Sequence, residues 1–213
     1  MSVEADHRAQ QTPIRDQGPR DTCVAFAVSA AHEWMAAGTG LRSPEDALWS
    51  AHQIGGLPNI ESTTIEWALR GIDSNRHADE EAWPYGNPSW PAPRPAPASV
   101  KSAQLSLPPW REVLTPGFQS IAAEASAGLA VLLSIRVVVE AWRTVTGFVD
   151  AAPGRIARQG HAVLIVGAGA DSNGDHLIFK NSWGVAWGAL GFGLLSRRYV
   201  EAYIKRAFIL ERP

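Results

Sequence analysis

Residues 17–38, QGPRDTCVAFAVSAAHEWMAAG, contain the only cysteine of the 213-residue chain. Cys23 opens an apolar run with helical spacing, Asp21 and Thr22 suit an N-cap, and Gly38 suits a C-terminal stop. The pattern predicts a helix that begins at Cys23 and is buried nearly all round. Unpaired N–H groups and the helix dipole would favour a thiolate there. A lone cysteine is more often a small core residue, so a catalytic role needs partners further along the chain.

Composition describes an ordinary globular protein and excludes several classes. Hydrophobic residues make up 46% of the chain and the net charge is −2, which disfavours a nucleic-acid partner. No apolar run approaches 18 residues and residues 1–13 lack a secretory h-region, so we expect neither a membrane span nor a signal peptide. A single cysteine excludes an intramolecular disulfide and predicts a reducing compartment, the cytoplasm.

Local patterns divide the chain into a helical and a β-rich half. Ser43 and Pro44 start a predicted helix that ends near residue 52, and Thr63 with Glu66 forms a capping box for a helix that stops at Gly71. Residues 83–97 hold six prolines and predict an extended strap at a domain boundary. A helix over 116–127 precedes strands predicted at 129–139, 161–166, 176–180, 192–195 and 207–210. We therefore expect an α+β fold with a helical lobe, 1–97, and a β-rich lobe, 98–213.

Two polar residues of the β-rich half can complete a site with Cys23. His161 begins one predicted strand and Asn181 ends the next, and residues 171–175 form a hairpin turn between them. Paired strands would bring the imidazole and the carboxamide together, so that Asn181 orients the ring and His161 takes the thiol proton. Gln17 and the Cys23 backbone N–H can donate to an oxyanion, and Trp183 can shield the His–Asn contact.

Four segments carry a resemblance to the papain-like cysteine peptidases. They are residues 17–26 (QGPRDTCVAF), the pair Gly55-Gly56, residues 160–167 (GHAVLIVG), and residues 180–188 (KNSWGVAWG). The chain resembles most the disulfide-free prokaryotic members without a prosegment. The resemblance implies a two-lobed fold, with an active-site cleft between a helical lobe and an antiparallel β-barrel-like lobe. It also implies an oxyanion hole at Gln17 and Cys23, and substrate contacts at Gly55, Gly56 and Trp183.

The chain departs from the family pattern beside the cysteine. Arg20 stands where the family has a disulfide cysteine, and Ile54 stands where it has the partner. Asp21 replaces a glycine that lines the substrate pocket before the scissile bond. As a solvated cap residue it would have no role in binding; alternatively, it narrows that pocket and favours a basic or amine-bearing substrate. The sequence begins close to the expected start of a catalytic domain, so we expect no prosegment and therefore narrow specificity or a dedicated protein partner.

These residues predict a thiol hydrolase that cleaves peptide or amide bonds. Cys23 would form an acyl-enzyme, and His161 would act as acid and base. The same acyl-enzyme could pass its acyl group to an amine, which makes an acyltransferase or amide-forming enzyme the first alternative. A catalytically silent binding module on the same fold is the second. We expect no metal and no cofactor.

Overall fold

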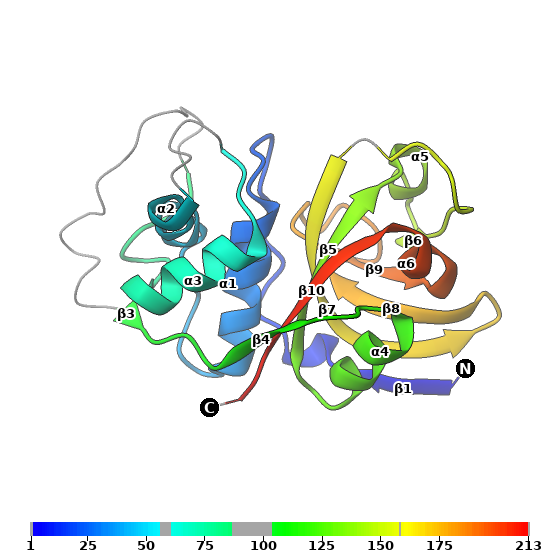
Figure 1. Ribbon diagram of the computed structural model, residues 1–213, viewed down its shortest axis with the longest axis horizontal. Helices are drawn as coiled ribbons and strands as arrows, with labels where there is room; N and C mark the ends of the chain where they lie inside the picture. The colour runs from blue at the N-terminus through cyan, green and yellow to red at the C-terminus, as the bar shows by residue number, and fades with distance from the viewer. Residues whose placement is uncertain (1, 56–60, 87–103, 158, 213) are drawn as a thin grey trace.

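The computed structural model describes residues 2–55, 61–86, 104–157 and 159–212. Three helices lie together on one side of the molecule, and a large sheet lies on the other (Figure 1). The helices are α1 (Cys23–Met35), α2 (Pro44–Gly55) and α3 (Ile65–Asn75). A short 3-10 helix, η1 (Arg8–Gln10), precedes them, and the two-stranded ladder of β2 (His77–Ala78) and β3 (Gln104–Leu105) lies beside them.

The large sheet has eight strands in the order β4-β10-β5-β7-β8-β9-β6, and β1 also pairs with β7. Every pair is antiparallel except β6 with β9. The strands are β1 (Ser2–Asp6), β4 (Trp110–Val113), β5 (Ala130–Val137), β6 (Phe148–Val149), β7 (Gln159–Asp171), β8 (Gly174–Lys180), β9 (Phe192–Ser196) and β10 (Ile204–Leu210). Helices α4 (Phe118–Ser126), α5 (Val139–Trp142) and α6 (Arg197–Tyr203) accompany it. The α+β, papain-like two-lobed prediction is confirmed.

The sheet is buried on both faces, and each face belongs to a different hydrophobic core. Leu132 and Leu164 pack with α1, α2 and α3 in the first core. Their neighbours Leu133 and Val163 pack with α4 and α6 in the second. Coverage of both faces explains why the middle of β7 is a continuous run of buried residues rather than an alternating one. β7 is therefore a wall shared by the two cores.

The predicted turn between the strands of His161 and Asn181 is confirmed. β7 and β8 pair in antiparallel register from Leu164↔Lys180 to Asp171↔Gly174. Gly174 has φ +96°, which glycine adopts without strain, and the Asn173 backbone N–H donates to Asp171 Oδ1 at 2.7 Å. Both strands are longer than predicted. Alanines and glycines extend β7 to residue 171, and β8 begins two residues before its predicted start, at Gly174.

The helices begin close to their predicted residues. The N-cap of α1 is Thr22, one of its two predicted candidates, although its side chain makes no capping hydrogen bond; its hydroxyl lies 2.9 Å from the Tyr85 hydroxyl. Two predictions for α3 were wrong. Its cap is Thr64, which accepts from the Trp67 N–H, rather than Thr63. α3 also runs past Gly71 to residue 75. A Cβ at Gly71 would lie 2.3 Å from the Ser50 carbonyl oxygen, so this glycine permits close packing of α2 against α3 rather than ending the helix.

Most of the proline-rich strap, residues 87–97, lies outside the described residues, and the division of the chain at residue 97 stays a prediction. In the part of the chain that the structure describes, each helix is too short or too polar to cross a membrane.

Candidate active site

A cleft of about 550 Å³ opens where the first turn of α1 faces β7 and β5. Its lining includes five of the residues predicted for the site, which are Gln17, Asp21, Cys23, His161 and Trp183. Residues nearly 140 positions apart in the sequence therefore meet at one groove.

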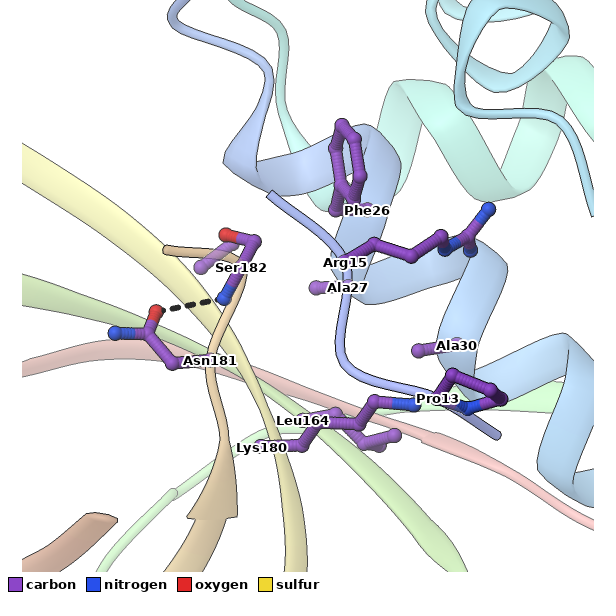
Figure 2. Close-up of a pocket in the computed structure, with 10 residues that line it drawn as sticks. Pro13, Arg15, Phe26, Ala27, Ala30, Leu164, Lys180, Asn181 and Ser182 are labelled. Carbon is purple, nitrogen blue, oxygen red and sulfur yellow. Dashed lines mark hydrogen bonds between the residues drawn. The ribbon is translucent and has the colours of Figure 1, made fainter. Parts of the chain in front are cut away.

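Asn181 follows β8 and lies beside the cleft, where it contacts His161. The Nε2 atom of His161 lies 2.8 Å from Asn181 Oδ1. The backbone N–H of Ser182 donates to the same oxygen at 2.9 Å (Figure 2). Both contacts identify the atom facing the ring as the oxygen of the carboxamide. His161 Nε2 is then the donor, and Nδ1 is left as the ring's acceptor. This is the arrangement expected of a base whose tautomer is fixed by a neighbouring amide.

Two tryptophans enclose the imidazole. The Trp183 ring lies 4.7 Å from the His161 ring and tilted by 33°, as expected for a residue that covers the His–Asn contact. The second, Trp142, meets the His161 ring edge-on at 5.2 Å, and its indole N–H donates to the Tyr199 hydroxyl at 2.7 Å. The sequence analysis missed Trp142. It lies just after β5 and no motif marks it.

Burial favours the uncharged forms of both the thiol and the imidazole. It raises the pKa of the Cys23 thiol. It also lowers the pKa of His161 to about 4, although the hydrogen bond that His161 donates to Asn181 acts in the opposite direction. The backbone N–H groups of Ala162 and Val24 act on the Cys23 pKa in the opposite direction. The prediction that the helix end lowers the thiol pKa is therefore wrong, because burial has the larger effect. Ala162 directly follows His161, so the contact between the Ala162 backbone N–H and the Cys23 sulfur places the thiol close to the His161 residue.

Gln17 is buried and held from both lobes. Its Nε2 donates to the Arg20 carbonyl oxygen at 2.5 Å, and its Oε1 accepts from the Ser182 hydroxyl at 2.7 Å. The Tyr85 hydroxyl donates to the Gln17 backbone carbonyl at 2.8 Å. A carboxamide has two N–H donors, so one remains for an oxygen in the cleft. Ser182 is a second residue that the sequence analysis missed, although it stands between Asn181 and Trp183.

The segments on either side of the cleft are joined by a short antiparallel bridge. The Gln17 N–H donates to the Ser182 carbonyl at 2.8 Å, and Asp16 pairs with Trp183. Gly184, with φ +73°, lets the chains approach, since a Cβ there would lie 2.9 Å from an Asp16 carboxylate oxygen. This bridge places the Gln17 carboxamide relative to the Asn181–His161 pair.

The lobes are also closely packed behind the site. Figure 2 shows Ala27 and Ala30 of α1 on one side and Leu164 of β7 and Lys180 of β8 on the other. The cavity that these residues line has a volume of only about 20 Å³. A space of that size holds about one water molecule. Small side chains on α1 allow this approach, so the helix carrying Cys23 is seated firmly on the strands that carry His161 and Asn181.

Arg20 stands where the family has a disulfide cysteine, and ion pairs hold it in place. Its buried guanidinium pairs with Glu45 on α2 and with Glu61, and lies over the Tyr85 ring at 4.6 Å. Asp21 next to it is exposed and takes part in no ion pair among the described residues.

The other two residues predicted to contact the substrate are Gly55 and Gly56, and neither is among the described residues that line the cleft. Gly55 ends α2 against Trp67, where a Cβ would lie 2.2 Å from the indole, and Gly56 lies outside the described residues. Their assignment to substrate binding stays a prediction. Within the described ranges no cluster of three His, Cys, Asp or Glu side chains could hold a metal ion.

Comparison with known proteins agrees with this geometry. Chicken cathepsin K is 30% identical over 92% of this chain and 58% of its own length, and chymopapain from Carica papaya is 24% identical over 93% and 55%. The chain thus spans little more than half the length of these relatives.

Solved structures show the same fold. Xylellain, a cysteine protease from Xylella fastidiosa, has a TM-score of 0.83 at 18% identity and covers 100% of this chain and 85% of its own. The Carica candamarcensis cysteine protease CMS1MS2, solved in complex with E-64, has a TM-score of 0.76 at 20% identity, with 98% of both chains covered. The family model described as papain family cysteine protease matches residues 61–210, which include His161 and Asn181 but not Gln17 or Cys23. The fold brings Gln17 and Cys23 to the same cleft as His161. Because the family model matches more than half of the chain, the chain belongs to the papain family of cysteine proteases.

Proposed function

We propose that this protein is a thiol hydrolase that cleaves peptide or amide bonds through an acyl-enzyme on Cys23. The observation that carries the proposal is the 2.8 Å contact between His161 and Asn181, beside a cleft that is lined by both His161 and the chain's only cysteine. A thiol next to an imidazole of fixed tautomer is the arrangement that nucleophilic catalysis requires.

In the proposed mechanism, the proton moves from sulfur to His161 as sulfur attacks the carbonyl carbon of the bound substrate. Because burial favours the neutral forms of both groups, the charged pair would form only as sulfur attacks the carbonyl carbon. Gln17 and the Cys23 backbone N–H would stabilise the oxyanion. Protonated His161 would then give its proton to the leaving amine, and neutral His161 would activate the water that releases the acyl group.

We further propose that Asp21 selects a basic or amine-bearing group next to the reacting bond. Its carboxylate lies in the cleft two positions before Cys23, and among the described residues it has no cationic partner. Its charge also raises the pKa of the thiol. Asp21→Asn should therefore lower the thiol pKa and reduce the preference for lysine over norleucine at that substrate position. An unchanged preference would contradict the role in selection.

The proposed place of action is the cytoplasm. A single cysteine suits a reducing compartment, and Arg20 makes ion pairs where a disulfide would otherwise be expected. An active protease there calls for narrow specificity or a dedicated protein regulator, and the charged cleft supports the first of these.

The decisive experiment is to trap and turn over the acyl-enzyme. The wild-type protein should react at Cys23 with an epoxide inhibitor at one equivalent, measured by intact mass, and should hydrolyse a mixed peptide library. Cys23→Ala should abolish turnover while the circular dichroism spectrum is unchanged. Adding primary amines tests the transfer reaction, since aminolysis products exceeding hydrolysis products would replace the hydrolase with an acyltransferase. Failure of Cys23 to react with iodoacetamide at neutral pH would favour a silent binding module.

A further inference from the structure

An irregularity in β10 directs two consecutive cationic side chains into the cleft. β10 pairs with β5 at Ile204↔Ile135 and then at Arg206↔Ser134, so the register shifts and Lys205 has no partner residue. In a regular strand, consecutive side chains point to opposite faces; a bulge changes this and re-aims one of them. Lys205 and Arg206 accordingly both line the cleft.

The two cations differ in their partners. Arg206 donates to Glu112 at 2.7 and 2.8 Å and to Glu66 at 2.8 Å, and Glu66 also pairs with Arg70, so these two arginines and two carboxylates balance. Lys205 is exposed, and among the residues that the structure describes it makes no ion pair and no side-chain hydrogen bond. This wall of the cleft therefore carries one uncompensated positive charge.

The order of the strands shows on which side of the reacting atoms this charge lies. β8, which leads to Asn181 and Trp183, borders one edge of β7, and β5 borders the other, with β10 beyond it. Ser134 pairs with Ala162, the residue whose N–H contacts the thiol, and with Arg206. Two strand spacings separate β10 from β7, roughly 10 Å, which is the reach of about three extended residues. Lys205 is thus on the side opposite Trp183.

We propose that Lys205 binds a carboxylate on the acyl side of the substrate, two or three residues before the bond that is cleaved. The inference rests on the proposed hydrolase function, in which the leaving amine departs on the side of His161 and Trp183. Asp21 repels a second carboxylate close to Cys23, so the acidic group is accepted only at a distance from sulfur. The carboxylate belongs either to an acidic side chain or to a dicarboxylic cap on the peptide N-terminus.

The test compares matched peptides that differ only in charge. Glutamate or glutamine is placed at each of the three positions before the scissile bond, and a further pair carries a succinyl or a succinamyl cap. The ratio of kcat/KM within each pair is measured for wild type, Lys205→Met and Lys205→Arg. Arg212→Met is the matched control, because this exposed arginine also makes no ion pair among the described residues and lies beyond the end of β10.

At one position, wild type should prefer the charged peptide by roughly fivefold, the size expected for an exposed ion pair. Lys205→Met should bring that ratio close to one, Lys205→Arg and Arg212→Met should keep it, and high salt should reduce it. Preference for glutamate identifies a side chain as the source of the carboxylate, and preference for the succinyl cap identifies the terminus. The same ratio in wild type and Lys205→Met, with neutral peptides still cleaved, overturns this inference alone.

If wild type cleaves no peptide of the set, the hydrolase proposal fails. The role of Lys205 is then tested by measuring peptide affinity instead of cleavage. Calorimetric titration of Cys23→Ala with each pair should then give tighter binding of the charged peptide, lost in the Cys23→Ala, Lys205→Met double variant. Equal affinities within every pair overturn the inference.

Discussion

At the scale of single residues, the buried imidazole of His161 sets the expected acid limit of activity. Its pKa of about 4 means that the ring stays neutral, and able to take the thiol proton, down to that pH. We expect kcat/KM to fall as the pH drops through about 4. Since the Asn181 hydrogen bond raises this pKa, Asn181→Ala should move the limb to lower pH as well as slow the reaction. A limb near 6.5, the ordinary value for histidine, would contradict the assignment.

The hydrogen bond that the Ser182 hydroxyl donates to Gln17 Oε1 is expected to position the Gln17 carboxamide, and substitutions of the two residues test this. Gln17→Ala should reduce kcat by about 10²-fold, as expected for loss of one oxyanion donor. Ser182→Ala removes the donor to Gln17 Oε1 and should cost less, roughly tenfold, because the carboxamide keeps its bond to Arg20. In the double variant the loss should equal that of Gln17→Ala alone, because Ser182 acts through Gln17. Additive losses, measured as kcat and KM for all three, would give Ser182 a separate role.

The residues of the site were predictable to the extent that local pattern records them. Cys23 at a helix start, and His161 and Asn181 on two strands joined by a recognisable turn, follow from spacing and turn chemistry. Trp142 and Ser182 do not, because their roles depend on long-range contacts to His161 and Gln17. The direction of the Cys23 pKa shift was also missed, because burial at the meeting of two lobes cannot be seen from the helix alone.

At the scale of elements, Gly71 shows why the end of α3 was placed too early. Glycine in a helical pattern commonly marks a stop, but here it lies against the Ser50 backbone of α2, and the helix ends at Arg76 with φ +65°. A local pattern does not distinguish a glycine that ends a helix from one that lets two helices approach. Helix starts were predicted better than helix ends for this reason.

The cluster of Arg20, Glu45 and Glu61 holds the Cys23 loop on α2. Arg20→Met would leave Glu45, whose side chain is only 7% exposed, without its cation. The expected loss in free energy of unfolding is about 3–5 kcal/mol, as when a buried pair is broken from one side. Chemical denaturation measures it, and Arg20→Met with Glu45→Gln should recover part of the loss. Arg8→Met, which breaks the exposed pair with Asp6, is the control and should cost no more than about 1 kcal/mol. If Arg20→Met lost as little free energy of unfolding as Arg8→Met, the cluster would not stabilise the fold as proposed.

At the scale of the whole molecule, buried histidines in different places make folding stability depend on pH. Burial lowers the pKa of His161 and His32 to about 4, and it lowers the pKa of His77 well below the ordinary value for histidine. The unfolded chain then binds more protons than the folded chain below pH 6.5, so the free energy of unfolding falls as the pH drops from 6.5 toward 4. For His32 and His161 the full loss is on the order of 3 kcal/mol each.

Asp46 opposes this trend. Burial raises its pKa to about 6, so the folded state binds the extra proton and gains stability as the pH falls from 6 toward 3.8. Urea denaturation between pH 7 and pH 4 should show a net loss for wild type and a steeper one for Asp46→Asn, in which the opposing group no longer titrates. A flat wild-type profile over this interval would contradict the buried, neutral state of the histidines.

The ionic cluster at Arg20 has a practical consequence for handling the protein. Reductants that keep a nucleophilic sulfur from oxidising also attack disulfides, so an enzyme braced by a disulfide beside its active site can be weakened by the conditions that preserve its activity. A guanidinium held by carboxylates is indifferent to dithiothreitol. Here the one thiol can be fully protected, or tagged with a maleimide dye as the sole reporter of the groove, without loosening the loop that carries it.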